Sequence, residues 1–392
     1  MAEALQGRDV RNPTVIHVGR GALNRLPETL QDLGIHRAVL VTDRVMGASV
    51  WMDRLTTMAD AADVKLTITG DLDNEPTTRD VDTVVTVLRS THAEAVIGFG
   101  GGSALDTAKS AAVLAGNSGE LRDYEGYERI PHAGLPLVAI PTTSGTGSEV
   151  TRGVAVTDSD RNVKMLLMSS RLVPTAAIVD PSPTLTMPKS ITASTGLDAL
   201  THAIEAYVSR RRQPLTDALA LDAIVRIAAS LARAYKTPGD IEAREQMSIA
   251  SLHAGMAFHN SSVALVHGMS RPIGAYFHVP HGLSNAMLLP TVMAFSITGD
   301  VTRYGAVARA MGVASTDRSD TSAAEAGVAF VCKLCSDLDV PTPTAWGIDR
   351  EKFRQLAPQM ALDAISSGSP GNNPRTANEQ EIIGLYEEVI AA

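Results

Sequence analysis

The stretch EAVIGFGGGSALDTAKS, from Glu94 to Ser110, decides the fold of this chain. It opens with a nearly unbroken apolar run, which is typical of a strand buried on both faces of a parallel sheet. Three consecutive glycines, Gly100 to Gly102, come next, and a helical pattern follows from Ser103 to Leu114. A strand, a glycine-rich turn and a helix in this order predict a βαβ unit.

The same alternation runs through the first half of the chain. Four further apolar runs predict strands at Arg37–Thr42, Val64–Thr69, Pro136–Pro141 and Ala176–Asp180. A helical pattern at Thr78–Ser90 lies between two of them. We therefore expect an α/β domain with a parallel, Rossmann-like sheet over residues 1–188.

The pattern changes after a proline-rich segment, Asp180–Ser190. Strand patterns become rare beyond it, and long amphipathic segments take their place. These segments lie at Ile191–Ser209, Leu215–Tyr235, Ile241–Phe258, Leu283–Thr298 and Ala323–Leu338. We expect an all-α domain over residues 189–392.

The composition excludes several classes of partner. The 392 residues are 44% hydrophobic and 20% charged with a net charge of −9, which is ordinary for a globular protein. No basic stripe with interleaved aromatic residues occurs, so we do not expect nucleic acid as a partner. No apolar run is long enough to span a membrane, and the N-terminal MAEALQGRDV has no apolar targeting core. We expect no membrane partner and a cytoplasmic location.

The glycine run at the head of the predicted helix is a candidate phosphate site. Glycine lets the backbone approach a phosphate closely, and a helix N-terminus offers free N–H groups and the positive end of its dipole. The run is not a P-loop, since no Gly-Lys-Ser/Thr follows. It also does not match G-x-G-x-x-G, because Ser103 replaces the last glycine. A structural tight turn is the alternative, although such a turn needs fewer glycines.

A second loop, PTTSGTGSEVT from Pro141 to Thr151, also follows a predicted strand and is rich in glycine and hydroxyl groups. Two such loops at neighbouring strand ends favour a dinucleotide over a single phosphate. Asp43 closes another predicted strand, where a carboxylate can hold a ribose 2′-OH and would repel a 2′-phosphate. An ordinary turn aspartate is an equally good interpretation of that residue.

Four residues of the second half form a candidate metal site. Asp198 and His202 are four residues apart in TGLDALTHAIEAY, which places them on one face of a helix. His267 and His281 lie within LVHGMSRPIGAYFHVPHG, where Pro272 and Pro280 should break any continuous helix. One carboxylate and three imidazoles suit Fe(II), Zn, Co or Mn and leave an open position for a substrate oxygen. Ordinary core or surface histidines are the alternative.

These motifs resemble those of the iron-containing alcohol dehydrogenases, the group that includes lactaldehyde (propanediol) oxidoreductase and 1,3-propanediol dehydrogenase. Along nearly the whole chain the resemblance is carried, in order, by GFGGGSALDTAK, PTTSGTGSEVT, TGLDALTHAIEAY, VHGMSRPIGAYFHVPHG and NNPR (Asn372–Arg375). It implies a dinucleotide-binding α/β domain and a helical domain, an architecture shared with dehydroquinate synthase. It also implies a metal- and NAD(H)-dependent enzyme that interconverts a small primary alcohol and its aldehyde.

The resemblance implies roles for single residues. The metal, Fe(II) or Zn(II), would be held by Asp198, His202, His267 and His281; the metal-free maleylacetate reductases lack this set. The predicted cofactor contacts are Asp43, Asn74, Gly100, Gly101, Gly102, Ser103, Asp106, Thr142, Thr143, Thr146 and Lys164. Among them Asp43 would favour NAD over NADP.

One position departs from the family pattern. Many members carry a histidine four residues after the first late ligand, where this chain has Arg271, which stays charged and cannot act as a general base. We expect Arg271 and His278 to flank the substrate, with His278 or bulk water as the proton donor. Arg271 predicts an anionic tail on the substrate, as in succinate semialdehyde/4-hydroxybutyrate. A contact with cofactor phosphate, or with an acid of the helical domain, is an equal alternative.

Other functions are compatible with parts of the pattern. A glycerol-dehydrogenase-like or dehydroquinate-synthase-like enzyme shares the fold class but carries different ligands. A non-catalytic dinucleotide-binding protein would need no open metal site, and a metallohydrolase would leave both loops unexplained. Members of the family are commonly dimers or larger, which implies a homo-oligomer.

Overall fold

A computed structural model of the chain describes residues 10–12, 14–72, 75–161 and 163–391. The described residues form two compact units, one from Asn12 to Met187 and one that begins at Pro188. Arg11 groups with the second unit, because its backbone N–H donates a hydrogen bond of 2.8 Å to Asn260 Oδ1. Each unit has its own hydrophobic core.

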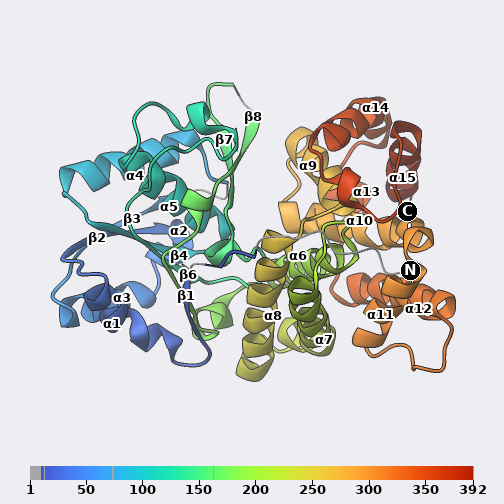
Figure 1. The fold of residues 1–392 in the computed structure, drawn as a ribbon, viewed down its shortest axis with the longest axis horizontal. Helices are drawn as coiled ribbons and strands as arrows, with labels where there is room; N and C mark the ends of the chain where they lie inside the picture. The colour runs from blue at the N-terminus through green and yellow to red at the C-terminus, as the bar shows by residue number, and fades with distance from the viewer. Residues whose placement is uncertain (1–9, 13, 73–74, 162, 392) are drawn as a thin grey trace. The chain divides into compact units, whose positions relative to one another are not determined.

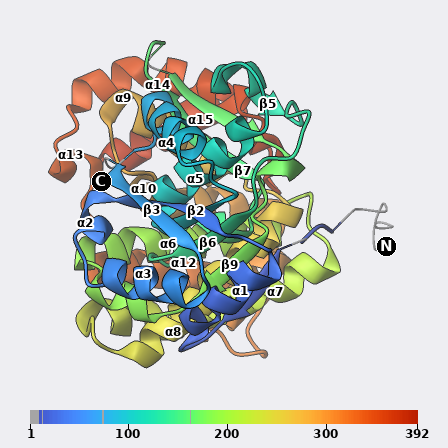
Figure 2. The same ribbon diagram turned by 90° about the vertical axis from the view of Figure 1, so that its left-hand side faces the viewer.

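The first unit is built on a six-stranded parallel sheet in the order β1-β9-β6-β4-β2-β3 (Figures 1 and 2). Its strands are β1 Val15–Val18, β2 Arg37–Asp43, β3 Lys65–Leu72, β4 Ala95–Gly100, β6 Leu137–Pro141 and β9 Ala176–Val179. A smaller sheet, in the order β5-β8-β7, contains β5 Gly126–Tyr127, β7 Gly153–Asp158 and β8 Val163–Met168.

Helices cover both faces of the larger sheet, as Figure 2 shows. They are α1 Leu26–Asp32, α2 Arg44–Gly47, α3 Trp51–Ala61, α4 Thr78–Ser90 and α5 Gly102–Ala115. Successive side chains of β2 point to opposite faces, so Val39 and Val41 pack with α4 and α5, whereas Leu40 packs with α1 and α3. Burial of each such side chain stabilises the sheet by about 2 kcal/mol.

The sheet order brings the predicted loops together. Strand β4 pairs in parallel with both β2 and β6, so the residues that follow these three strands meet at one edge. Thr142, just after β6, donates its backbone N–H to Gly100 O over 2.9 Å. Asp43 ends β2 on the other side of β4. The loops are therefore neighbours because of the order of the strands, which the sequence alone does not state.

The second unit is helical, and none of its described residues lies in a strand. Its helices are α6 Lys189–Val208, α7 Pro214–Lys236, α8 Ile241–Asn260, α9 Leu265–Phe277, α10 His281–Ser296, α11 Val301–Ala310, α12 Asp320–Asp337, α13 Pro343–Trp346, α14 Arg350–Ser366 and α15 Glu379–Ala391. Short 3-10 turns occur in both units: η1 Ala22–Arg25, η2 Leu121–Tyr124, η3 Ser148–Val150, η4 Ser170–Leu172 and η5 Ser182–Thr186 in the first, and η6 Ile297–Gly299 and η7 Pro370–Asn372 in the second. Within the described part of the chain, no helix is both long and apolar enough to cross a membrane.

The expected fold class, a parallel sheet with helices followed by a helical half, is confirmed. Three features differ from the expectation. Strand β1 and the small sheet have no counterpart in the predicted strands, since both are short or half exposed. Pro272 lies inside α9 and does not break it; the break falls at His278, which adopts a left-handed conformation with φ 54°.

Candidate functional site

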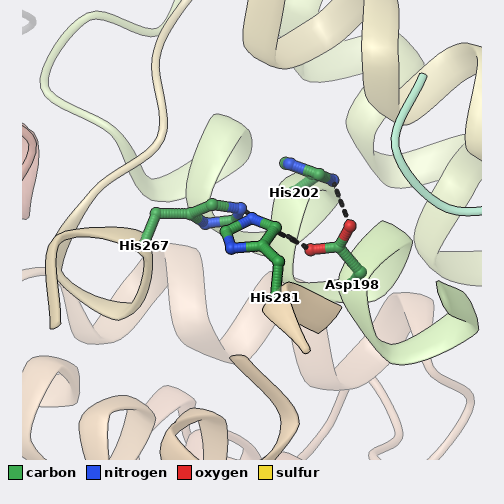
Figure 3. Close-up of side chains that lie close together, drawn as sticks. All are labelled: Asp198, His202, His267 and His281. Atoms are coloured by element: carbon green, nitrogen blue, oxygen red, sulfur yellow. Dashed lines mark ion pairs between the residues drawn. The ribbon is translucent and has the colours of Figure 1, made fainter. Parts of the chain in front are cut away.

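Four side chains converge inside the helical unit (Figure 3). Asp198 and His202 come from α6, His267 from α9, and His281 is the first residue of α10. One ligand atom from each lies within 4.8 Å of all the others. We call these four residues the ligand cluster. Its members are buried except His281, whose side chain is 40% exposed and leaves one side open.

The Asp198 carboxylate faces the three imidazoles, and the dashed lines of Figure 3 mark its ion pairs with them. Its Oδ1 is 3.7 Å from His267 Nε2 and 3.8 Å from His281 Nε2, and its Oδ2 is 3.9 Å from His202 Nδ1. Atoms that bind one cation at about 2.1 Å lie at most about 4 Å apart. The ligand cluster therefore needs only small side-chain movements to hold an ion.

Local sequence explains why the cluster forms. The four-residue spacing of Asp198 and His202 puts both on one face of α6. A Cβ at Gly282 would lie 2.5 Å from the carbonyl oxygen of Ser194 and 3.2 Å from Cβ of Asp198. Glycine at that position thus lets the start of α10 lie directly on α6, which brings the adjacent His281 to Asp198.

Glu205 supports the cluster and was missed in the sequence. Its buried carboxylate accepts hydrogen bonds from His267 Nδ1 at 2.6 Å and from the backbone N–H groups of Ala264 and Val266. Burial raises the pKa of Glu205 to about 7, although the two backbone donors act to lower it. The sequence contains a signal for this role, because Glu205 follows His202 by three residues and therefore shares its helix face.

Asn285 is a second missed residue, four positions after His281 on α10. Its Nδ2 is 2.7 Å from Asp198 Oδ1, 3.2 Å from His267 Nε2 and 3.3 Å from His281 Nε2. An amide –NH₂ group, which carries partial positive charge, thus contacts three of the four ligand atoms. The positive end of this polar group therefore faces the same atoms that would bind a cation.

The remaining observations fit a metal as well. His202 Nδ1 is buried and has no hydrogen-bond partner among the described residues, which is costly unless a ligand satisfies it. Burial lowers the pKa of His267 well below its usual range, and neighbouring His202 and Arg271 act in the same direction. A neutral imidazole is the form that binds metal. Stacking on Phe258, with centroids 4.2 Å apart, holds the His202 ring in place.

The predicted cofactor loops meet in the α/β unit. A Cβ at Gly102 would lie 2.8 Å from Cγ2 of Thr146, and one at Gly101 would lie 3.3 Å from Cγ2 of Thr143. A Cβ at Gly100 would lie 3.2 Å from Asp43 Oδ2. The glycine run is therefore in contact with the second loop and with Asp43, and its lack of side chains is what permits this approach.

Two family models match the chain. One, described as iron-containing alcohol dehydrogenase, matches residues 13–181, and the other, described as Fe-containing alcohol dehydrogenase family, C-terminal, matches residues 192–390. The chain belongs to the iron-containing alcohol dehydrogenase family. The resemblance expected from the motifs is confirmed.

Similar proteins agree with this membership. A 1,3-propanediol dehydrogenase of Klebsiella pneumoniae is 35% identical over 379 residues, which cover 96% of this chain and 97% of the relative. A crystal structure of 1,3-propanediol oxidoreductase has a TM-score of 0.94 at 34% identity, covering 98% of this chain and 100% of that one. Sulfoacetaldehyde reductase from Bifidobacterium kashiwanohense, in complex with NAD+, has a TM-score of 0.87 at 28% identity, covering 99% and 100%. The expected class, an oxidoreductase of alcohols and aldehydes, is confirmed, and the alternative functions are not favoured.

Other predicted cofactor contacts of this iron-containing alcohol dehydrogenase lie in the α/β unit. Asp106 accepts hydrogen bonds from Ser148 Oγ at 2.7 Å and from Ala155 N at 3.0 Å, so its carboxylate joins α5 to the second loop and β7. Lys164, on β8, is partly exposed and pairs with Glu75 at 3.1 Å. Asn74 lies outside the described residues.

The two predicted substrate-side residues lie on or next to α9. Arg271 is partly buried, and its Nη1 donates to Ser369 Oγ over 3.1 Å. Among the described residues Arg271 forms no ion pair, so the alternative in which it pairs with an acid of the helical domain finds no support there. His278 is exposed at the C-terminal end of α9.

Proposed function

We propose that this protein interconverts a small primary alcohol and its aldehyde, with NAD(H) as hydride carrier and a divalent cation in the ligand cluster. The observation that carries the proposal is the cluster itself, one buried carboxylate and three imidazoles, one of which has an unsatisfied nitrogen. Fe(II) is the proposed ion, and Zn(II) is the alternative, because nitrogen and oxygen ligands suit both.

Bound there, the cation would supply a Lewis acid for the substrate oxygen, and nicotinamide would carry the hydride. Asp198 contributes the one negative charge of the cluster. Glu205 accepts a hydrogen bond from Nδ1–H of His267, which leaves Nε2 of that ring to face Asp198. Burial of these groups excludes water from one side, and the exposed edge of His281 leaves a side for the substrate.

His278 is the proposed proton donor to the alcohol oxygen, with bulk water as the alternative. Its exposed position next to α10 and three residues before His281 supports this role. General acid catalysis contributes about 100-fold or more to a rate. His278→Ala should therefore lower kcat by about that factor and change its pH profile, whereas a wild-type rate and profile would assign the proton to water.

Asp43 supports NAD over NADP. Its Oδ1 accepts the backbone N–H of Met46 at 2.9 Å, and its Oδ2 is directed at the glycine run. A 2′-phosphate in this place would meet a carboxylate already fixed by that hydrogen bond.

Location in the cytoplasm and assembly into a homo-oligomer stay predictions.

The function is tested by NADH oxidation with butanal, using protein prepared anaerobically with Fe(II), with and without a chelator. Turnover should be lost when the chelator removes the metal, and it should return when Fe(II) or Zn(II) is added back. His267→Ala should lose both bound metal and turnover, because it removes one of four ligands. His253→Ala is the matched control, since His253 lies in the same unit but pairs with Asp222. Turnover that survives in metal-free protein would contradict the proposal.

A further inference from the structure

Arg271 is a cation with few partners next to the ligand cluster. It follows His267 by one turn of α9, so both side chains leave the same face of the helix. Its only hydrogen bond to a described residue is the one to Ser369 Oγ, and it forms no ion pair with any of them. A guanidinium has five N–H donors, so four of them have no acceptor among the described residues.

The surroundings do not compensate the charge. Burial lowers the pKa of Arg271 from its usual range, although the charge of Glu205 acts to raise it. The carboxylate of Glu205, however, already accepts hydrogen bonds from His267 and from two backbone N–H groups. A partly buried cation of this kind costs free energy until an anion pairs with it.

The guanidinium is also held in place. Ser369 is buried, and the turn η7 that follows it packs directly on α9. A Cβ at Gly268 would lie 2.7 Å from the ring of Pro370, so glycine permits this close packing. Ser369 thus fixes one edge of the guanidinium and leaves its other donors available, which is how a binding group is preorganised.

Charge balance points in the same direction. A divalent cation in the ligand cluster would be neutralised by Asp198 and Glu205, the two carboxylates that contact it or its ligand. The charge of Arg271 would then remain in excess. A neutral substrate leaves this excess as it is, whereas a substrate with one negative charge removes it.

We propose that Arg271 binds an anionic group at the far end of the substrate, so that the preferred substrate is a short aldehyde or alcohol with a carboxylate tail. The inference rests on the proposed function and names its substrate class. Guanidinium binds carboxylate with two parallel hydrogen bonds. The four residues from His267 to Arg271 rise by about 6 Å along the helix, which suits a short chain with its reacting oxygen at the ligand cluster and its carboxylate at Arg271.

The test compares kcat/KM for succinate semialdehyde and for butanal, which has the same number of carbons and no charge. The wild-type protein should prefer the semialdehyde by about tenfold or more. Arg271→Gln should abolish this preference and so reduce the ratio of the two efficiencies by about tenfold or more, the value of at least one lost hydrogen bond to a charged group. Arg271→Lys should retain part of the preference, because it keeps the charge and loses the two-pronged geometry.

Two controls keep the result specific. Arg354→Gln removes an exposed arginine of α14 that pairs with Glu387, and it should leave the ratio unchanged. Metal content and thermal unfolding of each variant show that the ligand cluster and the fold are intact. Equal wild-type efficiencies, an equal loss on both aldehydes in Arg271→Gln, or a raised KM for NADH alone would overturn the inference.

A binding measurement separates this inference from the proposed function. Calorimetry with the metal-loaded protein should give a lower Kd for 4-hydroxybutyrate than for 1-butanol, and Arg271→Gln should abolish the difference. Turnover of butanal without this difference would refute the anionic tail alone. Selective binding of 4-hydroxybutyrate without turnover of either aldehyde would instead refute the proposed function and retain the anion site.

Discussion

At the scale of single residues, the proposed metal centre depends on groups outside the ligand cluster. When ionised, Glu205 favours the tautomer of His267 with its proton on Nδ1, because a carboxylate can only accept a hydrogen bond there. The other nitrogen, Nε2, is thereby left with its lone pair toward Asp198. Such supporting groups tune metal affinity even though they never touch the ion.

We expect Glu205→Gln to weaken metal binding by about 10- to 100-fold. Glutamine keeps the volume and one acceptor oxygen, but it loses the charge and brings an –NH₂ group toward the N–H donors of Ala264 and Val266. Competition with a chromophoric chelator measures the affinity. Glu387→Gln, at an exposed site, is the control. An unchanged affinity would show that the backbone alone orients His267.

At the scale of elements, the glycine run depends on contacts between consecutive βα turns. The run ends β4, caps α5 and forms its first residue, and the side chains that approach it come from the loop after β6 and from Asp43 at the end of β2. Five of the six parallel strands, all but β1, and most helices could be predicted because their apolar periodicity is local. The contact between the two loops could not, since it depends on β4 and β6 being neighbours in the sheet.

Gly102→Ala should weaken NADH binding by about tenfold, because the new Cβ would lie 2.8 Å from Thr146 and displace the loop. Metal content should not change, since the ligand cluster lies entirely in the helical unit. Gly384→Ala is the matched control: a Cβ there meets nothing within 4 Å. NADH fluorescence titration gives the Kd. An equal Kd for NADH in Gly102→Ala and wild type would show that the glycine run does not contact the cofactor.

At the scale of the whole molecule, stability of the α/β unit depends on a buried cation. Lys109 of α5 donates from Nζ to the carbonyl oxygens of Ser148 and Gly153, each at 2.9 Å. It also contacts the hydroxyls of Ser148 and Thr151. One side chain therefore joins α5, η3 and β7. Burial lowers the pKa of Lys109 from 10.5 to about 8, against the charges of Asp106 and Glu149, which raise it.

Lys109→Met should reduce the free energy of unfolding of this unit by about 3 kcal/mol, because it leaves buried carbonyl oxygens without their donor and removes the positive charge near the Asp106 and Glu149 carboxylates. The chain has two tryptophans, Trp51 in this unit and Trp346 in the helical one, so Trp51 fluorescence in a Trp346→Phe background reports urea unfolding of the α/β unit.

The comparison of wild type with Lys109→Met also tests the pKa of Lys109. Its pKa is lower when folded, so the unfolded chain binds more protons between pH 8 and 10.5. The free-energy cost of keeping Lys109 protonated in the folded protein is fully present below pH 8, and it disappears as the pH rises through this range. The stability of wild type relative to Lys109→Met should therefore increase from pH 8 to 10.5. Parallel pH profiles would show that Lys109 titrates normally.

The sequence by itself determined the class of fold, the order of the elements and the ligand cluster as a candidate. These features rest on local periodicity and on residue types whose chemistry is the same in any fold. Only the tertiary structure decided which residues support that cluster, that Pro272 lies within α9, and that Arg271 has no acidic partner among the described residues. Each of these depends on contacts between segments far apart in the chain, such as Glu205 with His267 and Arg271 with Ser369, and no local pattern records such contacts.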